Sequence, residues 1–218
     1  MSTILITGAT GYIGQQLVIA LAQHAAHKLI TLVRPTSDTS LIKQLANCHV
    51  YDGAFSSINQ LFVKEKIDLV VHLAALTAPQ ATQNNMDQLI QANLVLSTHL
   101  LQAMLLNNCY KFINTGSYFQ HYRGDQDYSP VSLYAAMKQA VETIIEYYVE
   151  AEKFQVITLK LTDVYGPNDT RKKLFQYLLD AYKEKKPIAM SKGEQYVNLL
   201  YIDDLINAYI KAIEYLIS

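Results

Sequence analysis

Hydrophobic and polar positions along the chain change period repeatedly, from short apolar runs to longer stretches with apolar residues three and four apart. The short β-branched runs predict strands at residues 3–7, 28–33, 49–51, 69–74, 111–115, 155–161 and 196–201. The longer stretches predict helices at 15–25, 87–106 and 133–153, with a late helix that contains Asp203 and Asp204. Since strands and helices alternate with short connections, the sequence predicts an α/β fold built on a doubly wound parallel sheet.

The polar and glycine-rich segments follow the predicted strands. In a doubly wound sheet a ligand lies beyond the carboxyl ends of the strands. The segments that fall there are residues 8–14, Arg34, Asp52-Gly53, 74–77 and 115–117. We therefore expect them to surround one crevice.

The first of these segments is a glycine turn, Gly8-Ala-Thr-Gly11-Tyr-Ile-Gly14, between the first strand and the first helix. Such a turn lets backbone amides approach a pyrophosphate at the positive end of the helix dipole, and its last glycine allows close helix–strand packing. The segment predicts dinucleotide binding. The alternative is an ordinary tight turn that binds nothing.

The position about twenty residues later distinguishes NAD from NADP, because a carboxylate there bonds the ribose 2′-hydroxyl of NAD. Arg34 stands at this position, and a guanidinium suits a 2′-phosphate, with Ser37 as a second donor. The sequence favours NADP(H). In the alternative, NAD(H) is the cofactor and Asp38 takes the role of the acid.

Tyr134 and Lys138 are four residues apart in a predicted helix and therefore share a face. A nearby cation stabilises a phenolate and moves the tyrosine pKa toward neutrality, where proton transfer is efficient. The pair predicts acid–base chemistry at an alcohol or carbonyl. A lysine that extends past a packed tyrosine to solvent is the structural alternative.

Composition excludes several other classes of function. The chain has 218 residues, half of them hydrophobic, and a formal net charge of −1. With no basic block, no nucleic-acid partner is expected. No apolar segment is expected to reach the length of a membrane span and no leader is apparent, so a soluble cytoplasmic protein is predicted. Cys48, Cys109 and the scattered histidines lack metal-ligand spacing, so no metal site is expected.

Six motifs together resemble the extended short-chain dehydrogenase/reductase family, in its NAD-dependent epimerase/dehydratase group, over the whole chain. They are the glycine turn, Val71-His-Leu-Ala-Ala75, Asn93, the Tyr134/Lys138 pair, Leu161-Thr-Asp-Val-Tyr-Gly-Pro167 and Tyr201-Ile-Asp-Asp204. The resemblance implies an NAD(P)-binding Rossmann domain at 1–165. It also implies a partial substrate-binding region at 166–218, interleaved with the last strand and helix of the Rossmann sheet.

The same resemblance assigns catalytic roles. Tyr134 is the general acid/base, and Lys138 lowers its pKa and holds the ribose hydroxyls of the nicotinamide nucleotide. Ser117 bonds the reacting oxygen, although Thr115, two residues earlier, is a second candidate. Asn93 is either catalytic or a buried structural amide. The implied cofactor-binding residues are Gly8, Thr10, Gly11, Tyr12, Ile13, Gly14, Arg34, Ser37, Asp52, Gly53, Leu73, Ala74, Ala75, Thr77, Asn93, Tyr134 and Lys138.

The residues after Ser117 limit which reaction of the family this chain can catalyse. Dehydratases of the family place an Asp-Glu pair there, whereas this chain has Tyr118-Phe119, which disfavours dehydration. Segments 113–122, 128–134 and 166–171 resemble the subgroup of CDP-abequose and CDP-paratose synthases, which reduce nucleotide-linked 4-keto-6-deoxyhexoses for surface polysaccharide. The alternatives are a 4-epimerase that retains NAD and a non-catalytic NAD(P)-binding sensor. Implied substrate-binding residues are Thr77, Ser117, Tyr118, Tyr165, Asn168 and Arg171.

Two further expectations concern assembly. The family normally continues beyond the helix with Asp203 and Asp204, so this chain is either a truncated form of a longer protein or a natural short form. Family members often pair through two helices, which correspond here to 87–106 and 133–153. We therefore expect a homodimer.

Arg171 has two alternative roles: its guanidinium binds the diphosphate of the substrate, or the residue begins a solvated helix.

Overall fold

The centre of the molecule is a six-stranded parallel sheet. The structure is a computed structural model and describes residues 1–23, 26–78, 81–124, 127–171, 173–194 and 196–218. The strands are β1 (Ser2–Thr7), β2 (His27–Val33), β3 (Asn47–Val50), β4 (Leu69–His72), β5 (Lys111–Ser117) and β6 (Gln155–Leu161). Their order is β3-β2-β1-β4-β5-β6, with every neighbouring pair parallel. This confirms the doubly wound α/β fold.

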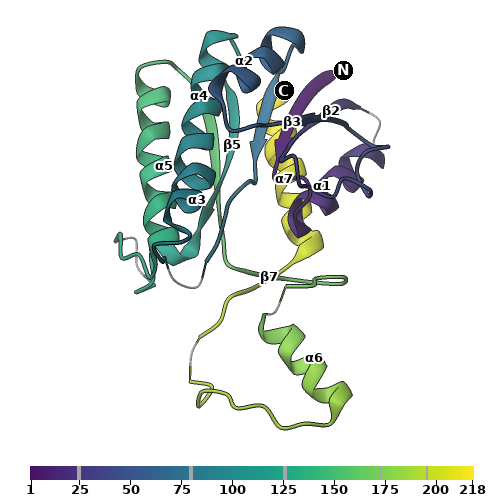
Figure 1. The fold of residues 1–218 in the computed structure, drawn as a ribbon, viewed down its shortest axis with the longest axis vertical. Helices are drawn as coiled ribbons and strands as arrows, with labels where there is room; N and C mark the ends of the chain where they lie inside the picture. The colour runs from purple at the N-terminus through teal and green to yellow at the C-terminus, as the bar shows by residue number, and fades with distance from the viewer. Residues whose placement is uncertain (24–25, 79–80, 125–126, 172, 195) are drawn as a thin grey trace.

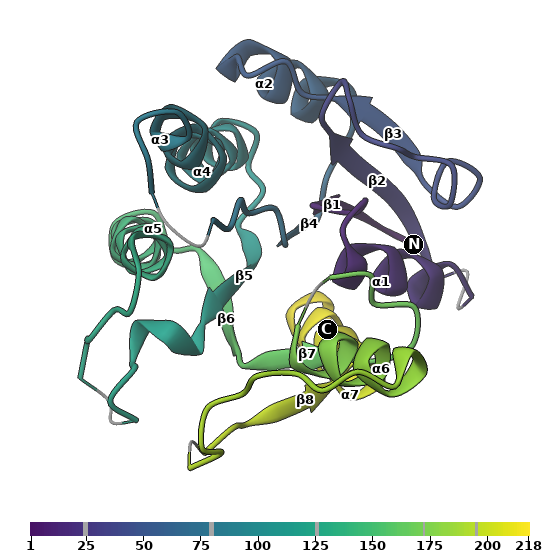
Figure 2. The same ribbon diagram turned by 60° about the horizontal axis from the view of Figure 1, so that its bottom comes forward.

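Helices cover both faces of the sheet (Figures 1 and 2). On one face lie α1 (Tyr12–Gln23) and α7 (Ile202–Ile217), and on the other α2 (Phe55–Lys64), α4 (Leu96–Leu106) and α5 (Leu133–Glu150). Ile4 and Ile6 of β1 enter the core under α1 and α7, while Leu5 enters the core under α2, α4 and α5. Because side chains alternate along a strand, a strand segment buried on both faces is a continuous apolar run, as Ile4-Leu5-Ile6 is.

One long helical segment crosses the second face without interruption. It consists of α3 (Met86–Ile90), a π-helical turn η1 (Gln91–Val95) and α4. By length and composition Met86–Leu106 could cross a membrane, so the expectation that no segment reaches that length was wrong. Leu100, Leu101 and Met104 are buried against the sheet, which accounts for its apolar composition.

The last strand does not join the main sheet. β8 (Leu199–Tyr201) pairs in parallel with β7 (Asp163–Tyr165) in a separate two-stranded sheet. The prediction that the last strand belongs to the Rossmann sheet was therefore wrong, although the following helix, α7, does pack on it. Strands of three residues carry little periodicity, which is why β7 was not predicted and β8 was predicted to begin three residues too early.

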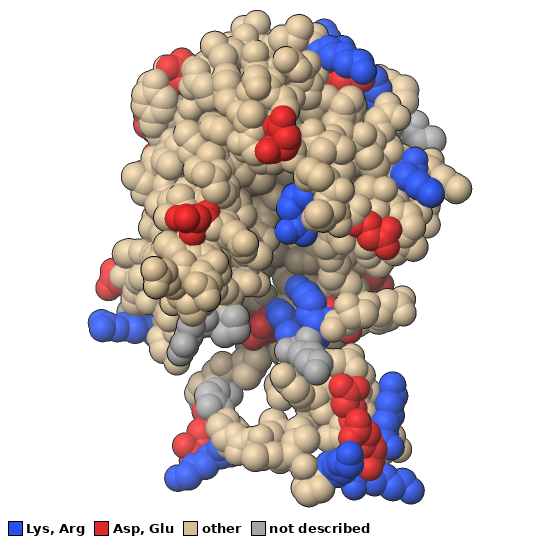
Figure 3. All heavy atoms as spheres, viewed as in Figure 1, with Lys and Arg blue, Asp and Glu red and all other residues tan. Residues whose placement is uncertain are grey.

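Between β7 and β8 the chain forms a lobe that contains α6 (Leu174–Glu184), another helix not predicted (Figure 1). None of the residues of α6 is buried. Figure 3 shows charged side chains close together on this lobe and more scattered over the body above it. The lobe begins after β7, which follows β6, an edge strand of the main sheet.

Predicted helix boundaries agree to different degrees. α5 begins at the predicted Leu133 because the Ser132 hydroxyl caps it, accepting from the Ala135 amide at 3.2 Å. α1 begins earlier than predicted, inside the glycine turn, and the predicted end at residues 24–25 lies outside the described residues. α2 was not predicted.

Candidate active site

The glycine turn is a place of close backbone approach. Gly8 has φ +70°, and a Cβ on it would lie 2.6 Å from the Ala74 amide nitrogen. A Cβ on Gly14 would lie 2.2 Å from the Gly8 carbonyl oxygen. The Gly11 amide donates to that carbonyl at 3.0 Å and closes the turn. The first and last glycines are therefore required where β1, α1 and the exit of β4 meet.

A crevice of about 840 Å³ lies at the carboxyl ends of the strands. Ten of the predicted cofactor residues line it: Gly8, Thr10, Gly11, Arg34, Ser37, Asp52, Gly53, Leu73, Ala74 and Ala75. Its size is in the range of small-molecule and cofactor sites. The predicted crevice is thus present with part of its predicted wall, whereas residues 115–117, which were expected to surround the same crevice, do not line it.

The rest of the crevice wall was missed by sequence reasoning. It consists of Leu32, Val33, Pro35, Thr36, Tyr51, Leu76, Gln88, Gln91, Ala92 and Leu96. Gln88, Gln91 and Ala92 have the three-and-four spacing of one helix face. That spacing is the signal that could have placed the helical segment Met86–Leu106 over the crevice.

The first turn of α1 does not line the crevice beyond Gly11. Gly14 is buried, and Ile13 packs against the core. The Tyr12 hydroxyl donates to the Pro167 carbonyl at 3.1 Å, and the Arg171 guanidinium lies 4.8 Å from the centre of the Tyr12 ring. Tyr12 therefore joins the glycine turn to the segment after β7.

Asn93 lies in the π-helical turn and is buried. Its side-chain amide donates to the carbonyls of Leu76 and Leu89 at 2.9 and 3.0 Å, and its oxygen accepts from the Leu76 amide at 3.1 Å. In this structure Asn93 is a hydrogen-bonded amide that holds the chain after β4. Thr77, just beyond, is exposed and does not line the crevice.

A second buried hydrogen-bond network, centred on His72 of β4, also holds the chain just after β4. His72 lies 2.7 Å from the Thr7 hydroxyl through Nδ1 and 2.9 Å from the Ser97 hydroxyl through Nε2. The Thr7 hydroxyl also accepts from the Ala74 amide at 3.1 Å. Complete burial lowers the pKa of His72 to about 3, and the charge of Lys138 acts in the same direction. A neutral His72 thus helps to fix the crevice floor at Ala74.

Tyr134 and Lys138 project from the first turns of α5. The Lys138 ammonium lies 5.8 Å from the centre of the Tyr134 ring, and the lysine is 4% exposed. Within the described part of the chain this ammonium has no hydrogen-bond acceptor. Burial lowers the pKa of Lys138 to about 8, and the Glu142 carboxylate opposes that shift. A buried cation without an acceptor fits a ligand hydroxyl.

The Tyr134 pKa moves in the direction opposite to the one expected from the sequence. Burial raises it, because desolvation disfavours the phenolate. Lys138 lies near the ring, but its charge does not outweigh burial in this state of the protein. Tyr134 also lines a cavity of about 300 Å³, together with Ala78, Ala81, Leu89, Val131, Ser132 and Leu133.

The two candidate hydroxyls at the end of β5 have different partners. The Ser117 hydroxyl caps the short 3-10 helix η2 (Tyr118–Gln120) and accepts from the Phe119 amide at 3.3 Å. The Thr115 hydroxyl lies 2.7 Å from the Tyr209 hydroxyl, and both residues are buried. Each hydroxyl is therefore engaged within the protein.

The predicted substrate residues are not brought together around either cavity. Tyr165 stacks on Phe175 with ring centres 4.6 Å apart, Asn168 is exposed with φ 62°, and Tyr118 is exposed. Arg171 forms two 2.7 Å hydrogen bonds to the Asp169 carboxylate and another to the Val164 carbonyl at 3.2 Å. α6 begins at Leu174 with Lys173 at its N-cap, so Arg171 precedes this exposed helix and is bound within the chain by Asp169.

Comparison with known proteins places the chain in a family. A model of the NAD dependent epimerase/dehydratase family matches residues 4–216. The chain belongs to this family. CDP-abequose synthase of Yersinia pseudotuberculosis is 32% identical over 209 residues, which cover 94% of this chain and 71% of that protein. The dTDP-D-glucose 4,6-dehydratase of Dictyostelium discoideum is 29% identical over 237 residues, covering 94% and 54%.

A solved structure of a sugar-nucleotide epimerase has a similar fold. The crystal structure of UDP-glucuronic acid 4-epimerase from Bacillus cereus, in complex with UDP-glucuronic acid and NAD, matches with a TM-score of 0.82 at 25% identity. The match covers 97% of this chain and 73% of that chain. The shared part therefore includes both the main sheet and the segment that follows it.

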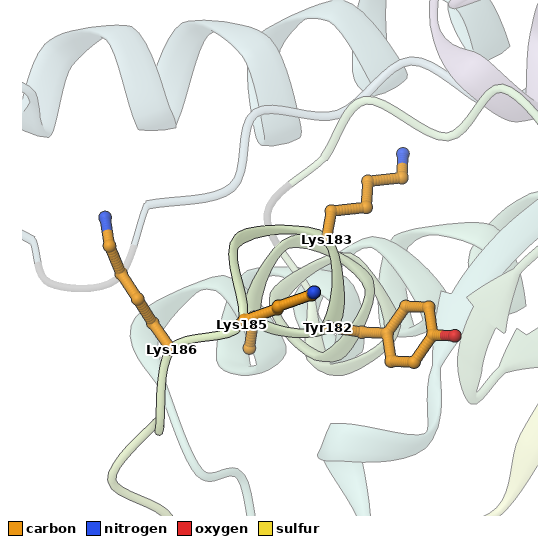
Figure 4. A pocket seen from close by; sticks show the side chains of 5 residues that line it. Tyr182, Lys183, Lys185 and Lys186 are labelled. Carbon is orange, nitrogen blue, oxygen red and sulfur yellow. The ribbon is translucent and has the colours of Figure 1, made fainter.

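A third cavity, of about 580 Å³, lies at the end of α6, away from the crevice at the carboxyl ends of the strands. Figure 4 shows Tyr182, Lys183, Lys185 and Lys186 around it, with side chains that do not converge on one point. All four are exposed, so the cavity has no converging polar groups. Among the described residues there is also no group of His, Cys, Asp and Glu that could hold a metal ion.

Proposed function

We propose that the protein reduces a nucleotide-linked 4-keto-6-deoxyhexose with NADP(H). Membership of the epimerase/dehydratase family supports the broader part of the proposal, an NAD(P)-dependent enzyme acting on nucleotide sugars. The single observation that carries the catalytic part is the buried Lys138 ammonium, which has no acceptor in the described chain and lies on one helix face with Tyr134. A tyrosine and a lysine in this arrangement can transfer a proton to or from an alcohol or carbonyl.

The crevice residues fit a dinucleotide. Gly8 and Gly14 leave no room for side chains where the pyrophosphate approaches the turn, and Asp52 and Gly53 lie at the adenosine end. Lys138 supplies donors for ribose hydroxyls. When bound, the reduced cofactor supplies a hydride. The preference for NADP(H) rests on Arg34 and Ser37, which line the crevice and offer a guanidinium and a hydroxyl to a 2′-phosphate.

Tyr134 acts as the proton donor to the oxygen at C4 as that oxygen gains negative charge. Its raised pKa keeps the phenol protonated at neutral pH, which suits the reducing direction. Lys138 stabilises the phenolate that remains. Ser117 donates a hydrogen bond to the reacting oxygen, and Thr115 is the alternative. Asn93 acts through the backbone after β4 that it holds.

Reduction is favoured over dehydration by the residues that follow Ser117. Tyr118 and Phe119 are exposed aromatic side chains, and neither replaces the acid and base that removal of water requires. The Yersinia relative is named a CDP-abequose synthase, and its similarity supports a CDP-linked sugar. Thr77, Tyr118, Tyr165, Asn168 and Arg171 are proposed on the substrate side. Arg171 would exchange Asp169 for a diphosphate.

A 4-epimerase is the second candidate, favoured by the similarity to the Bacillus cereus enzyme, whose structure contains NAD. An epimerase returns the hydride to its substrate and consumes no cofactor. We further propose cytoplasmic location and a homodimer formed through α3, α4 and α5. The proposed domains are residues 1–165 for the cofactor and 166–218 as a partial substrate region, interleaved with α7, which packs on the main sheet.

The test begins with fluorescence titration of NADPH and NADH, followed by addition of a CDP-4-keto-6-deoxyhexose while the reduced cofactor is monitored. We expect tighter binding of NADPH and its oxidation, abolished in Tyr134→Phe. Tyr147→Phe is the matched control, because Tyr147 lies exposed on the same helix. Full activity in Tyr134→Phe would contradict the mechanism. Sugar epimerisation without cofactor consumption would establish the second candidate, and cofactor binding without turnover of any sugar would indicate a sensor.

A further inference from the structure

We propose that Glu142 is a positioning residue for the Tyr134–Lys138 pair, holding a fixed carboxylate one helical turn beyond Lys138 so that the lysine stays charged. The proposal rests on the proposed function for its activity measurement only. Tyr134, Lys138 and Glu142 follow one another at intervals of four residues along α5. They therefore share one face of the helix.

The Glu142 carboxylate is held from two sides. One oxygen lies 3.1 Å from the Lys160 ammonium on β6. The other accepts from the Gln120 side-chain amide at 3.0 Å. The Glu142 side chain is 14% exposed, so these interactions form in a largely desolvated place. Both restrict the carboxylate to one orientation beside α5.

Gln120 connects this carboxylate to the end of β5. Its side chain is completely buried, and its oxygen accepts from the Ser117 amide at 2.8 Å. Its amide group donates to Gln139 and to Glu142, both on α5. The strand end that carries the candidate hydroxyl and the helix that carries Tyr134 are thus joined through Gln120 and Glu142.

Gly116 shows how closely the carboxylate approaches the strand. A Cβ at this position would lie 2.8 Å from a Glu142 carboxylate oxygen and 3.0 Å from Cγ of Lys160. A side chain at residue 116 would displace the carboxylate. The glycine therefore leaves the space that the Glu142–Lys160 pair occupies on this face of β5.

The charges around Lys138 identify Glu142 as its counter-charge. The titratable groups that face this region are Tyr134 and Glu142 on α5, His72 on β4, Lys160 on β6 and His121 after η2. His72 is neutral. His121 donates from Nδ1 to the Asp127 carbonyl, so its Nε2 accepts from the Lys160 ammonium at 2.8 Å. In this described set the negative charge acting on Lys138 is Glu142.

Loss of the Glu142 charge should lower the pKa of Lys138. Burial already lowers the pKa of Lys138 to about 8, and Glu142 is the group that raises it. Without the carboxylate the lysine pKa falls further, and the amine becomes mostly neutral near pH 7.5. A neutral amine does not stabilise the Tyr134 phenolate. Removal of Lys160 acts with the opposite sign, because it removes a cation that partly neutralises Glu142.

The direct test is NMR titration of the Lys138 side chain, followed through its ¹³Cε resonance in the protein without cofactor. In Glu142→Gln we expect the Lys138 pKa to fall by about one pH unit. In Lys160→Gln we expect it to rise. Glu146→Gln, exposed one turn further along α5, is the matched control and should leave it unchanged. An unchanged Lys138 pKa in Glu142→Gln would overturn the proposal.

The second measurement is the pH profile of turnover. Since the protonated lysine is required, activity is lost as pH rises through the Lys138 pKa, and in Glu142→Gln this alkaline limb should move to lower pH. We expect kcat to fall about fivefold near pH 8 with little change in KM, and Glu142→Asp to restore most of it. If the wild-type protein turns over no keto sugar, the proposed function fails, while the NMR titration still decides the role of Glu142.

Discussion

The hydroxyl groups of Thr115 and Tyr209 lie 2.7 Å apart, although the two residues are 94 positions apart in the chain. Thr115 stands near the end of β5 and Tyr209 in the middle of α7. Tyr209 is fully buried, and its pKa is raised by burial and by the charge of nearby Tyr134. The contact fastens α7, which follows the separate β7–β8 pair, to the strand that supports the active site.

This contact predicts a coupling free energy. Tyr209→Phe leaves the Thr115 hydroxyl buried without a partner and should destabilise the protein by about 1–3 kcal/mol. Thr115→Val in the same protein removes the unpaired group, so the double variant should be more stable than the sum of the single changes predicts. Urea denaturation of the four proteins measures the coupling. Strict additivity would mean that the hydroxyls do not interact.

At Gly14 we predict that adding one methyl group strongly destabilises the protein. In Gly14→Ala the new Cβ would fall 2.2 Å from the Gly8 carbonyl oxygen, where only backbone can move. We expect a loss of about 1–3 kcal/mol or more in the free energy of unfolding, together with loss of NADPH binding. For stability alone, Gly11→Ala is the comparison, because its new Cβ would lie 3.3 Å from the Gly8 carbonyl oxygen. Thermal unfolding monitored by circular dichroism compares them, and equal melting temperatures would contradict the close approach.

His72 predicts a pH-dependent stability. Its pKa is about 3 in the folded protein and near 6.5 in the unfolded chain, so below pH 6.5 the unfolded state binds a proton that the native state does not. The free energy of unfolding should therefore fall by up to about 1.4 kcal/mol per pH unit between pH 6.5 and 3. In His72→Gln this contribution disappears. Urea denaturation at several pH values should give a flatter curve for the variant, and parallel curves would show that His72 is protonated in the native state.

Arg34 predicts cofactor preference. In Arg34→Glu a guanidinium that lines the crevice becomes a carboxylate, which repels a 2′-phosphate. We expect NADPH affinity to fall about 10- to 100-fold and NADH affinity to stay the same or increase. Arg123→Glu, in an exposed loop, controls for the change in net charge. An equal loss for both cofactors would place Arg34 elsewhere than at the 2′ position.

Much of the fold and part of the site were predictable from local sequence. The β-branched runs, the glycine turn and the i, i+4 spacing of Tyr134 and Lys138 depend on residues adjacent in the chain, and the structure has the six main strands and the crevice where they indicate. The crevice wall from Gln88 and Gln91 was missed, although its helical spacing was present. The β7–β8 pair was missed because three-residue strands carry almost no pattern.

The sequence by itself determined the order of strands and helices, the turn that receives a dinucleotide and the residue types available for proton transfer. Only the tertiary structure decided their surroundings: that burial raises the pKa of Tyr134, that Thr115 pairs with Tyr209, and that Glu142 reaches Gln120 and Lys160. The physical reason is the distance along the chain over which each interaction acts. Periodicity and turn chemistry act between neighbours in the chain, whereas desolvation and hydrogen-bond partners depend on segments that folding brings together.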